Sequence, residues 1–349
     1  MAKYITLFLT LLLFTFCKNS QNKQAKPTKV AESTEQLAAS ARKSGAWLKA
    51  AKLYEKRYQA DPTNEEWNYQ TGTNYLKANY PQKALTILTS FAEHHKAGEF
   101  NGRIARIAKA YYQIGKHQEI EVLVKNYDYP KMYRGLAREH LKALIQLNKI
   151  ADLTTYLSLY KQEGIYDDKG KKTNTGFLYR AICNELLIVG DSQSLKVYAT
   201  EYYNWAIARQ EKDKRNLAIA ASYLQDSELA IKALNSAIAV EKSPRHQMEL
   251  EGLLGISYAK IKESKKAKLQ IEKIQGFEKL PNRHDAFGAN FYHQARIEIA
   301  LNQPEKAIQS LESALAAKAE FWSNRFREDG LLKELFPNEK FKELVHPKN

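Results

Sequence analysis

Short segments with helical periodicity, separated by turn residues, recur along most of this chain of 349 residues. From about Ser33 onward helix formers dominate, alternation of β-branched residues is scarce, and Gly, Pro, Asn and Asp mark the breaks. In the two clearest segments Ala50 and Ala84 occupy equivalent positions, 34 residues apart. A helix pair of that length cannot bury its apolar face alone, so successive pairs must stack on one another. The sequence therefore predicts an all-α fold built from repeated units.

Small, aromatic and proline residues keep a fixed order within these units. The segment 45–62 carries Ala50, Tyr54 and Pro62, and the next unit carries Trp67, Gly72, Tyr75, Ala84 and Leu88. This order resembles that of the tetratricopeptide repeat (TPR) family, with its W-x2-L-G-x2-Y…A-x3-F pattern. Two later units carry the same signature in Gly255, Tyr258, Ala267 and Ile271 and in Ala307, Leu311 and Ala314. The units between them carry fewer of these residues, and the resemblance covers about residues 33–345.

The resemblance implies a right-handed superhelical solenoid of about eight TPR-like helix pairs with an open concave groove. The segment 329–344 is similar to the capping helix that closes bacterial arrays of this family. The implied organisation is N-terminal repeats at 33–162, a polar loop at 163–176, and C-terminal repeats with the capping helix at 177–349. A solenoid of another helix-pair family would have nearly the same architecture. An irregular helical bundle fits less well, because the matches recur in order.

Residues 1–16 predict an export signal. Lys3 gives the segment a positive start, and the apolar stretch that follows is about a dozen residues, too short to span a hydrocarbon core of roughly 30 Å. Cys17 comes next. It opens the polar segment 17–32, which has too few apolar residues to form a core and predicts a flexible tether.

The order of leader, cysteine and polar tether resembles the signal of a bacterial lipoprotein. In such signals the cysteine thiol receives diacylglycerol, which implies lipidation of Cys17 and an exported protein anchored to the cell envelope, facing the periplasm or at the outer membrane. The leader departs from the usual motif, because Phe16 stands where a small residue is usual and Phe14 where leucine is usual. An uncleaved signal anchor and cleavage by the general signal peptidase are the alternatives.

Lysine and arginine outnumber the acidic residues by 54 to 39, which gives a formal net charge of +15. This surplus favours acidic partners, and export argues against nucleic acid. In TPR arrays one face of each first helix lines the groove. Alignment by the small positions places six residues there as a predicted basic stripe for an acidic segment or a C-terminal carboxylate of a partner: Arg106, Lys109, Arg138, Lys142, Arg180 and Asn184. Ordinary solvated charge on helix faces is the alternative interpretation.

These features predict a non-enzymatic scaffold that binds a partner protein or peptide in its groove. No nucleophile elbow, nucleotide fingerprint or metal-ligand spacing occurs, so we expect no catalytic residue, no metal and no cofactor. Cys183 falls at the small position of Gly72 and Gly255, which predicts a packing role. The alternative function is an accessory factor of envelope assembly or of a cell-wall enzyme, binding glycan or an enzyme. Three clustered aromatic residues prompt its glycan form, although core packing also explains them: Tyr202, Tyr203 and Trp205.

Metabolic labelling with a fatty acid tests the lipidation of Cys17. We expect the wild-type protein to incorporate the label and Cys17→Ala to lose it, together with membrane association, because the thiol is the acyl acceptor. Cys183→Ala removes the only other thiol and should keep the label. Equal labelling of the Cys17→Ala protein would contradict the prediction.

Overall fold

The computed structural model of this protein describes residues 33–90, 101–127, 131–167, 169–209, 213–277 and 288–348. The export signal 1–16, Cys17 and the tether 17–32 lie outside these residues, so the predictions made for them stay predictions. Thr34–Asn349 forms one compact unit. Within the described ranges, no helix has both the length and the apolar character that a membrane span requires.

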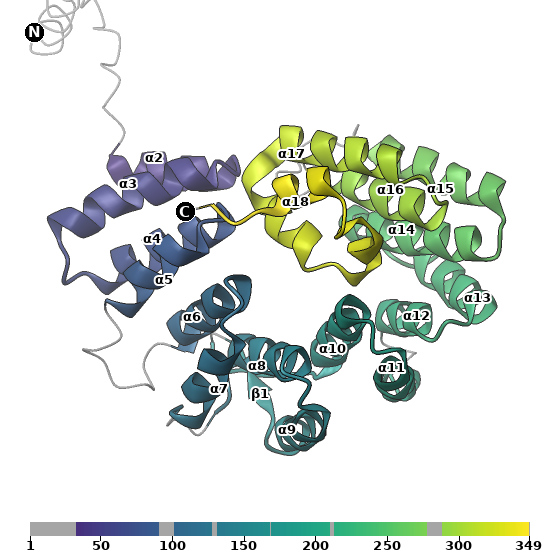
Figure 1. Ribbon diagram of the computed structural model, residues 1–349, viewed down its shortest axis with the longest axis horizontal. Helices are drawn as coiled ribbons and strands as arrows, with labels where there is room; N and C mark the ends of the chain where they lie inside the picture. The colour runs from purple at the N-terminus through teal and green to yellow at the C-terminus, as the bar shows by residue number, and fades with distance from the viewer. Residues whose placement is uncertain are drawn as a thin grey trace, which may run out of the picture. The chain divides into compact units, whose positions relative to one another are not determined.

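The described chain is an all-α array of helix pairs followed by a short cap (Figure 1). The two helices of a pair pack together across a short turn, and each pair contacts the next. Eight pairs lie in the described ranges: α2 (Thr34–Lys43) with α3 (Trp47–Ala60), α4 (Glu65–Lys77) with α5 (Pro81–Thr89), α6 (Asn101–Gln113) with α7 (His117–Lys125), α8 (Arg134–Gln146) with α9 (Ile150–Glu163), α10 (Gly176–Val189) with α11 (Ser192–Ile207), α12 (Lys214–Tyr223) with α13 (Ser227–Ile238), α14 (Pro244–Lys260) with α15 (Ser264–Gly276), and α16 (Ala289–Ala300) with α17 (Pro304–Arg327). The cap consists of the 3-10 helix η3 (Gly330–Leu335) and α18 (Glu339–Val345). The predicted all-α repeat fold is confirmed.

A residue with positive φ lies at the turn inside every one of these pairs. The eight turn residues are Gly45, Asn79, Gly115, Asn148, Gly190, Gln225, Lys262 and Asn302, and in each pair the second helix begins two residues later. At the second turn the amide of Asn79 donates to the carbonyl of Leu76 at 3.2 Å, and that of Tyr80 donates to Tyr75 at 2.9 Å. This is the bond pattern of a Schellman cap, which ends the first helix at a fixed place and turns the chain back. These residues therefore mark the register of the repeats.

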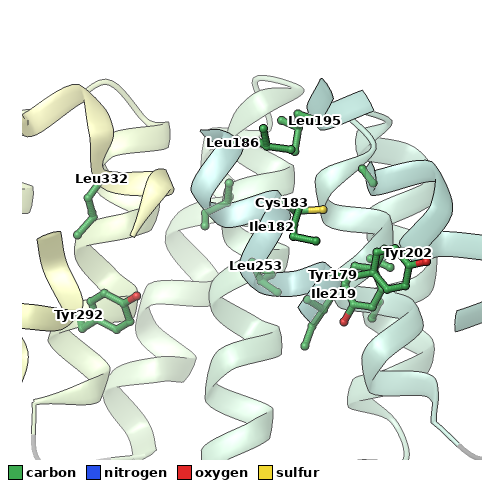
Figure 2. Packing of buried hydrophobic residues seen from close by; sticks show 14 of the residues in the cluster. Tyr179, Ile182, Cys183, Leu186, Leu195, Tyr202, Ile219, Leu253, Tyr292 and Leu332 are labelled. Carbon is green, nitrogen blue, oxygen red and sulfur yellow. The ribbon is translucent and has the colours of Figure 1, made fainter. Parts of the chain in front are cut away.

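Seven residues before the turn, the first helix comes close to its neighbours. A Cβ atom added at Gly72 would lie 2.4 Å from Cγ of Leu88 on the partner helix, so only glycine fits there without a shift. Cys183 holds the same position in α10 and is completely buried, which agrees with its predicted packing role. Figure 2 shows its sulfur among buried apolar side chains of the core. Burial raises the pKa of this thiol, which keeps it protonated and unreactive.

The loop at 163–176 interrupts the array without dividing its core. It contains the two short antiparallel strands β1 (Ile165–Tyr166) and β2 (Lys172–Thr173). Leu157 before the loop and Leu178 after it belong to the same apolar cluster, which continues to Val345. The hairpin lies against a continuous stack of helices, because Ile165 is completely buried in the same cluster and the amide of Tyr166 donates to the carbonyl of Met132 at 3.0 Å.

The C-terminal segment returns to the second pair of the array, where Figure 1 shows the end of the described chain beside α4. Helix α17 packs against α3 and α4, and the Asn324 side-chain amide donates to the carbonyl of Leu76 at 2.8 Å. The side-chain amide of Asn79 donates to the backbone carbonyl of His346 at 2.7 Å. The backbone amide of Lys348 donates to the backbone carbonyl of Asn79 at 2.8 Å. The groove expected to be open is thus bridged by the chain itself.

Alanine at Gly72 tests whether the close approach of the helices is essential. Because the new Cβ would collide with Leu88, we expect Gly72→Ala to lower the free energy of unfolding by about 1–3 kcal/mol. Gly276→Ala is the matched control: no atom of the described residues lies within 4 Å of an added Cβ there, and we expect stability to be unchanged or to rise by about 0.5 kcal/mol. Urea unfolding measures both, and equal effects would contradict the packing argument.

Candidate functional site

A cavity of about 690 Å³ lies between the first helices of the pairs. Its lining comes from α4, α6, α8, α10, α12, α14 and α16 and from α17. A volume of this size falls in the range of ligand sites, roughly 300–1,000 Å³. All six residues predicted for the concave groove line this one cavity: Arg106, Lys109, Arg138, Lys142, Arg180 and Asn184. Their role as contacts to a partner stays a prediction.

The turn register explains which residues face the cavity. Six positions before the turn residue, five of the first helices place a lining residue: Thr73, Lys109, Lys142, Asn184 and Arg296. Ten positions before the turn residue, three of the first helices place an arginine that lines the cavity: Arg138, Arg180 and Arg215. Alignment by the small positions found only the members in the middle repeats. Counting back from each turn residue would also have found Thr73, Arg215 and Arg296.

The lining is strongly cationic. Among the described residues it contains eleven lysine and arginine side chains and three carboxylates, those of Glu249, Glu328 and Asp329. The walls also restrict solvent, so charges in the cavity interact more strongly than charges on an open surface do. An anion that enters meets an attractive field from several sides.

The chain's own C-terminal segment occupies part of the predicted stripe. The Glu328 carboxylate lies 3.2 Å from the Lys142 ammonium and 3.9 Å from that of Lys109. The Asn184 side chain donates to the carbonyl of Glu328 at 2.6 Å and accepts from the amide of Gly330 at 3.0 Å. Three of the six predicted groove residues therefore bind an acidic segment of the same chain. Lys109 and Lys142 contact its side chain, and Asn184 bonds to its backbone. We call Lys109, Lys142 and Asn184 the Glu328 clamp.

Opposite charges shape the ionisation of the clamp. Burial alone would raise the pKa of the Glu328 carboxyl, but the charges of Lys109, Lys142 and neighbouring arginines lower it well below its usual range. Burial lowers the pKa of Lys142, but nearby carboxylates, Glu139 and Glu328 foremost, raise it above the ordinary lysine value. Both groups are therefore charged at neutral pH, and each depends on the other.

Two further predicted groove residues are paired with carboxylates. Arg138 contacts the buried Glu139 with 2.5 Å between nitrogen and oxygen, and Arg180 bonds to Glu249. Glu249 also accepts from Arg215 at 2.5 Å, so it bridges two guanidinium groups. Burial would raise the pKa of Glu249, yet these two arginines hold it well below its usual range. These pairs fix the positions of cations that face the cavity.

Other lining cations have no such partner. Within the part of the chain that the structure describes, no ion pair forms at Lys77, Arg106, Arg134 or Arg325. Arg134 instead lies over the ring of Phe177, 4.9 Å from its centroid. Sequence reasoning included only Arg106 of these four. The other three lie outside the two register positions: Lys77 ends α4, Arg134 begins α8, and Arg325 belongs to α17.

Metal ions and glycans are two other classes of ligand to compare with the described residues. No group of three or more His, Cys, Asp or Glu side chains there could hold a metal ion. The aromatic cluster considered for glycan packs into the protein, because Tyr202 is completely buried and Tyr203 and Trp205 lie against the main core. The Tyr202 hydroxyl donates to Asn216 at 2.7 Å.

No protein-family model matches this chain, and no curated protein sequence matches it. Among solved structures, a tetratricopeptide repeat protein from Parabacteroides merdae aligns over 89% of this chain and 96% of its own, with 14% identity and a TM-score of 0.42. The APC/C hetero-tetramer Cut9–Hcn1 aligns over 87% of this chain and 55% of the matched chain, with 14% identity and a TM-score of 0.38. Both TM-scores lie below 0.5, so the repeat architecture is assigned from this chain's own helix pairs and turns.

Neutralising Glu328 tests the clamp. We expect Glu328→Gln to lower the free energy of unfolding at pH 7 by about 2–3 kcal/mol, somewhat less than a fully buried pair, because Glu328 is 18% exposed. Since its pKa is lower in the folded state, its contribution is present above the unfolded pKa and is lost as the pH falls below about 4. Urea unfolding at pH 7 and at acidic pH measures both effects.

Glu339→Gln is the matched control for that experiment. Glu339 also pairs with a lysine, Lys342, but it is 81% exposed, so we expect a change within about 0.5 kcal/mol. An equal loss of stability in the two variants would contradict the special role of Glu328.

Proposed function

We propose that this protein is a non-enzymatic binding scaffold of the bacterial cell envelope that receives an acidic segment of a partner protein in its central cavity. The observation that carries the proposal is the lining, in which eleven cations face three carboxylates. Such an excess in a partly closed space is unfavourable for the empty protein and is relieved by a bound anion. The proposed partner therefore carries several acidic groups.

The Glu328 clamp supports a peptide as the ligand. It already recognises a glutamate side chain together with the carbonyl and amide of its neighbouring peptide groups. Charge-assisted hydrogen bonds of this kind are the usual means by which proteins bind acidic segments. A segment of another chain would find further cationic donors at Arg134, Arg138 and Arg180.

The cellular location is part of the proposal. The leader and Cys17 support export and a lipid anchor, with the tether 17–32 separating the array from the membrane. A protein held in this way samples partners near the membrane surface at a high local concentration. The alternative function, an accessory factor that binds glycan, is tested by the same experiment, because a glycan needs no cationic cavity.

Binding of a hexaglutamate peptide by calorimetry tests the proposal. We expect the double variant Arg134→Gln/Arg325→Gln to bind at least about tenfold more weakly, because two unpaired cavity charges are removed. The charge reversal Arg138→Glu/Arg180→Glu should abolish binding and the recovery of a partner from membranes. It also disturbs the pairs with Glu139 and Glu249, so the first variant guards against misfolding.

Lys196→Gln on the exposed face of α11 is the control and should bind as the wild type does. Rising salt should weaken the interaction, because it depends on charge. The acidic-partner assignment fails if the wild-type protein binds purified cell-wall glycan and shows no affinity for hexaglutamate. It also fails if the cavity variants bind the peptide as tightly as the control.

A further inference from the structure

Two cations at the N-terminal end of the cavity have no counter-charge. Lys77 lies near the end of α4 and Arg106 lies on α6, and both line the cavity. In the described ranges no carboxylate pairs with either of them, and the Arg106 Nε atom is buried without a hydrogen-bond partner. Lys109, one turn beyond Arg106, differs because it has Glu328 at 3.9 Å.

The surroundings of Lys77 are cationic as well as partly closed. Burial, and then the charges of Arg42, Arg106 and Lys109, lower its pKa to about 8. No acidic group contributes to the shift. The ammonium group lies over the ring of Trp47, 4.1 Å from the centroid, which holds it in place.

A hydroxyl group lies on the same face of the helix. Thr73 is one helical turn before Lys77, lines the cavity, and is buried, yet its Oγ1 has no hydrogen-bond partner. Other helical threonines in this chain return a bond to the carbonyl four residues earlier, as Thr71 does to Trp67 at 2.6 Å. A buried hydroxyl without a partner is unfavourable, so the unused bond at Thr73 points to a missing ligand.

We propose that Thr73, Lys77 and Arg106 form a subsite for a tetrahedral dianionic oxyanion, an inorganic phosphate or the phosphate group of a monoester. Two positive groups balance two negative charges, whereas a carboxylate carries only one. The hydroxyl, the ammonium and the guanidinium can each donate to a different oxygen of the same group. The subsite is separate from the Glu328 clamp and does not depend on the acidic partner proposed above.

Calorimetric titration of the folded protein with sulfate, inorganic phosphate and glycerol 3-phosphate tests the subsite. We expect Lys77→Gln and Arg106→Gln each to weaken binding at least about tenfold, and Thr73→Val, which keeps the shape of the side chain, to weaken it by about two- to fivefold. Arg134→Gln removes another unpaired charge from the same cavity and should change the affinity less than about threefold. Circular dichroism of each variant shows whether it remains folded.

Sulfate does not titrate between pH 7 and 9.5, so its pH dependence reports on the protein. Because the protonated form of Lys77 binds the anion, we expect sulfate affinity to fall by about tenfold over this range as the ammonium loses its proton. Lys77→Arg keeps the charge but does not titrate there. It should bind sulfate and lose this pH dependence.

Binding of inorganic phosphate but not of glycerol 3-phosphate assigns the subsite to the free ion. Equal binding of both assigns it to a phosphate group on a larger molecule. The proposal is overturned if folded wild-type protein binds neither, if acetate binds as tightly as sulfate, or if Arg134→Gln loses as much affinity as Lys77→Gln. Retained binding of hexaglutamate in Thr73→Val separates this outcome from a failure of the proposed function.

Discussion

The close contact between helices at the small positions, which most of the repeats have, is the constraint on which the rest of the structure depends. Where Gly72 or Gly255 stands, neighbouring helices approach until no larger side chain fits without a shift. A left-handed turn residue seven positions later fixes where the second helix starts. Together these two features give every pair nearly the same geometry, so that small rotations add up along the array. The sum of these rotations brings α17 back to α4.

This repeated geometry also organises the charges. In most of the pairs a residue six or ten positions before the turn lines the cavity, and many of these residues are lysine or arginine. Stacking therefore concentrates cations that would repel one another in the absence of carboxylates. Glu139, Glu249 and Glu328 relieve part of that repulsion from three different parts of the chain. The remaining excess is hard to explain by stability alone, since apolar residues would fill the same space at lower free energy. The proposed binding of an anionic ligand would account for this excess.

The features that depend on local residue spacing, namely the helix pairs and the inward-facing cations of the middle repeats, could be predicted from the sequence. The positions of Ala50, Gly72 and Gly255 predicted the helix pairs, and alignment on them predicted the inward-facing cations of the middle repeats. The partner of Lys142 was not predictable in this way. Glu328 lies 186 residues further along, and their contact depends on the accumulated curvature of all the intervening pairs. An error of a few degrees in each pair would separate these two side chains, whereas it would leave every helix assignment unchanged.

The bonds between Asn79 and the segment around His346 change how such an array can come apart. An open solenoid is a one-dimensional stack, whose outermost units fray because each has a neighbour on one side only. Here the second repeat contacts the C-terminal segment in addition to the repeats before and after it, so residues far away in the sequence give it a third neighbour. Partial opening of α4 therefore also releases the cap, and loss of the cap loosens the N-terminal repeats. We therefore expect the array to unfold more cooperatively than a stack of independent repeats does.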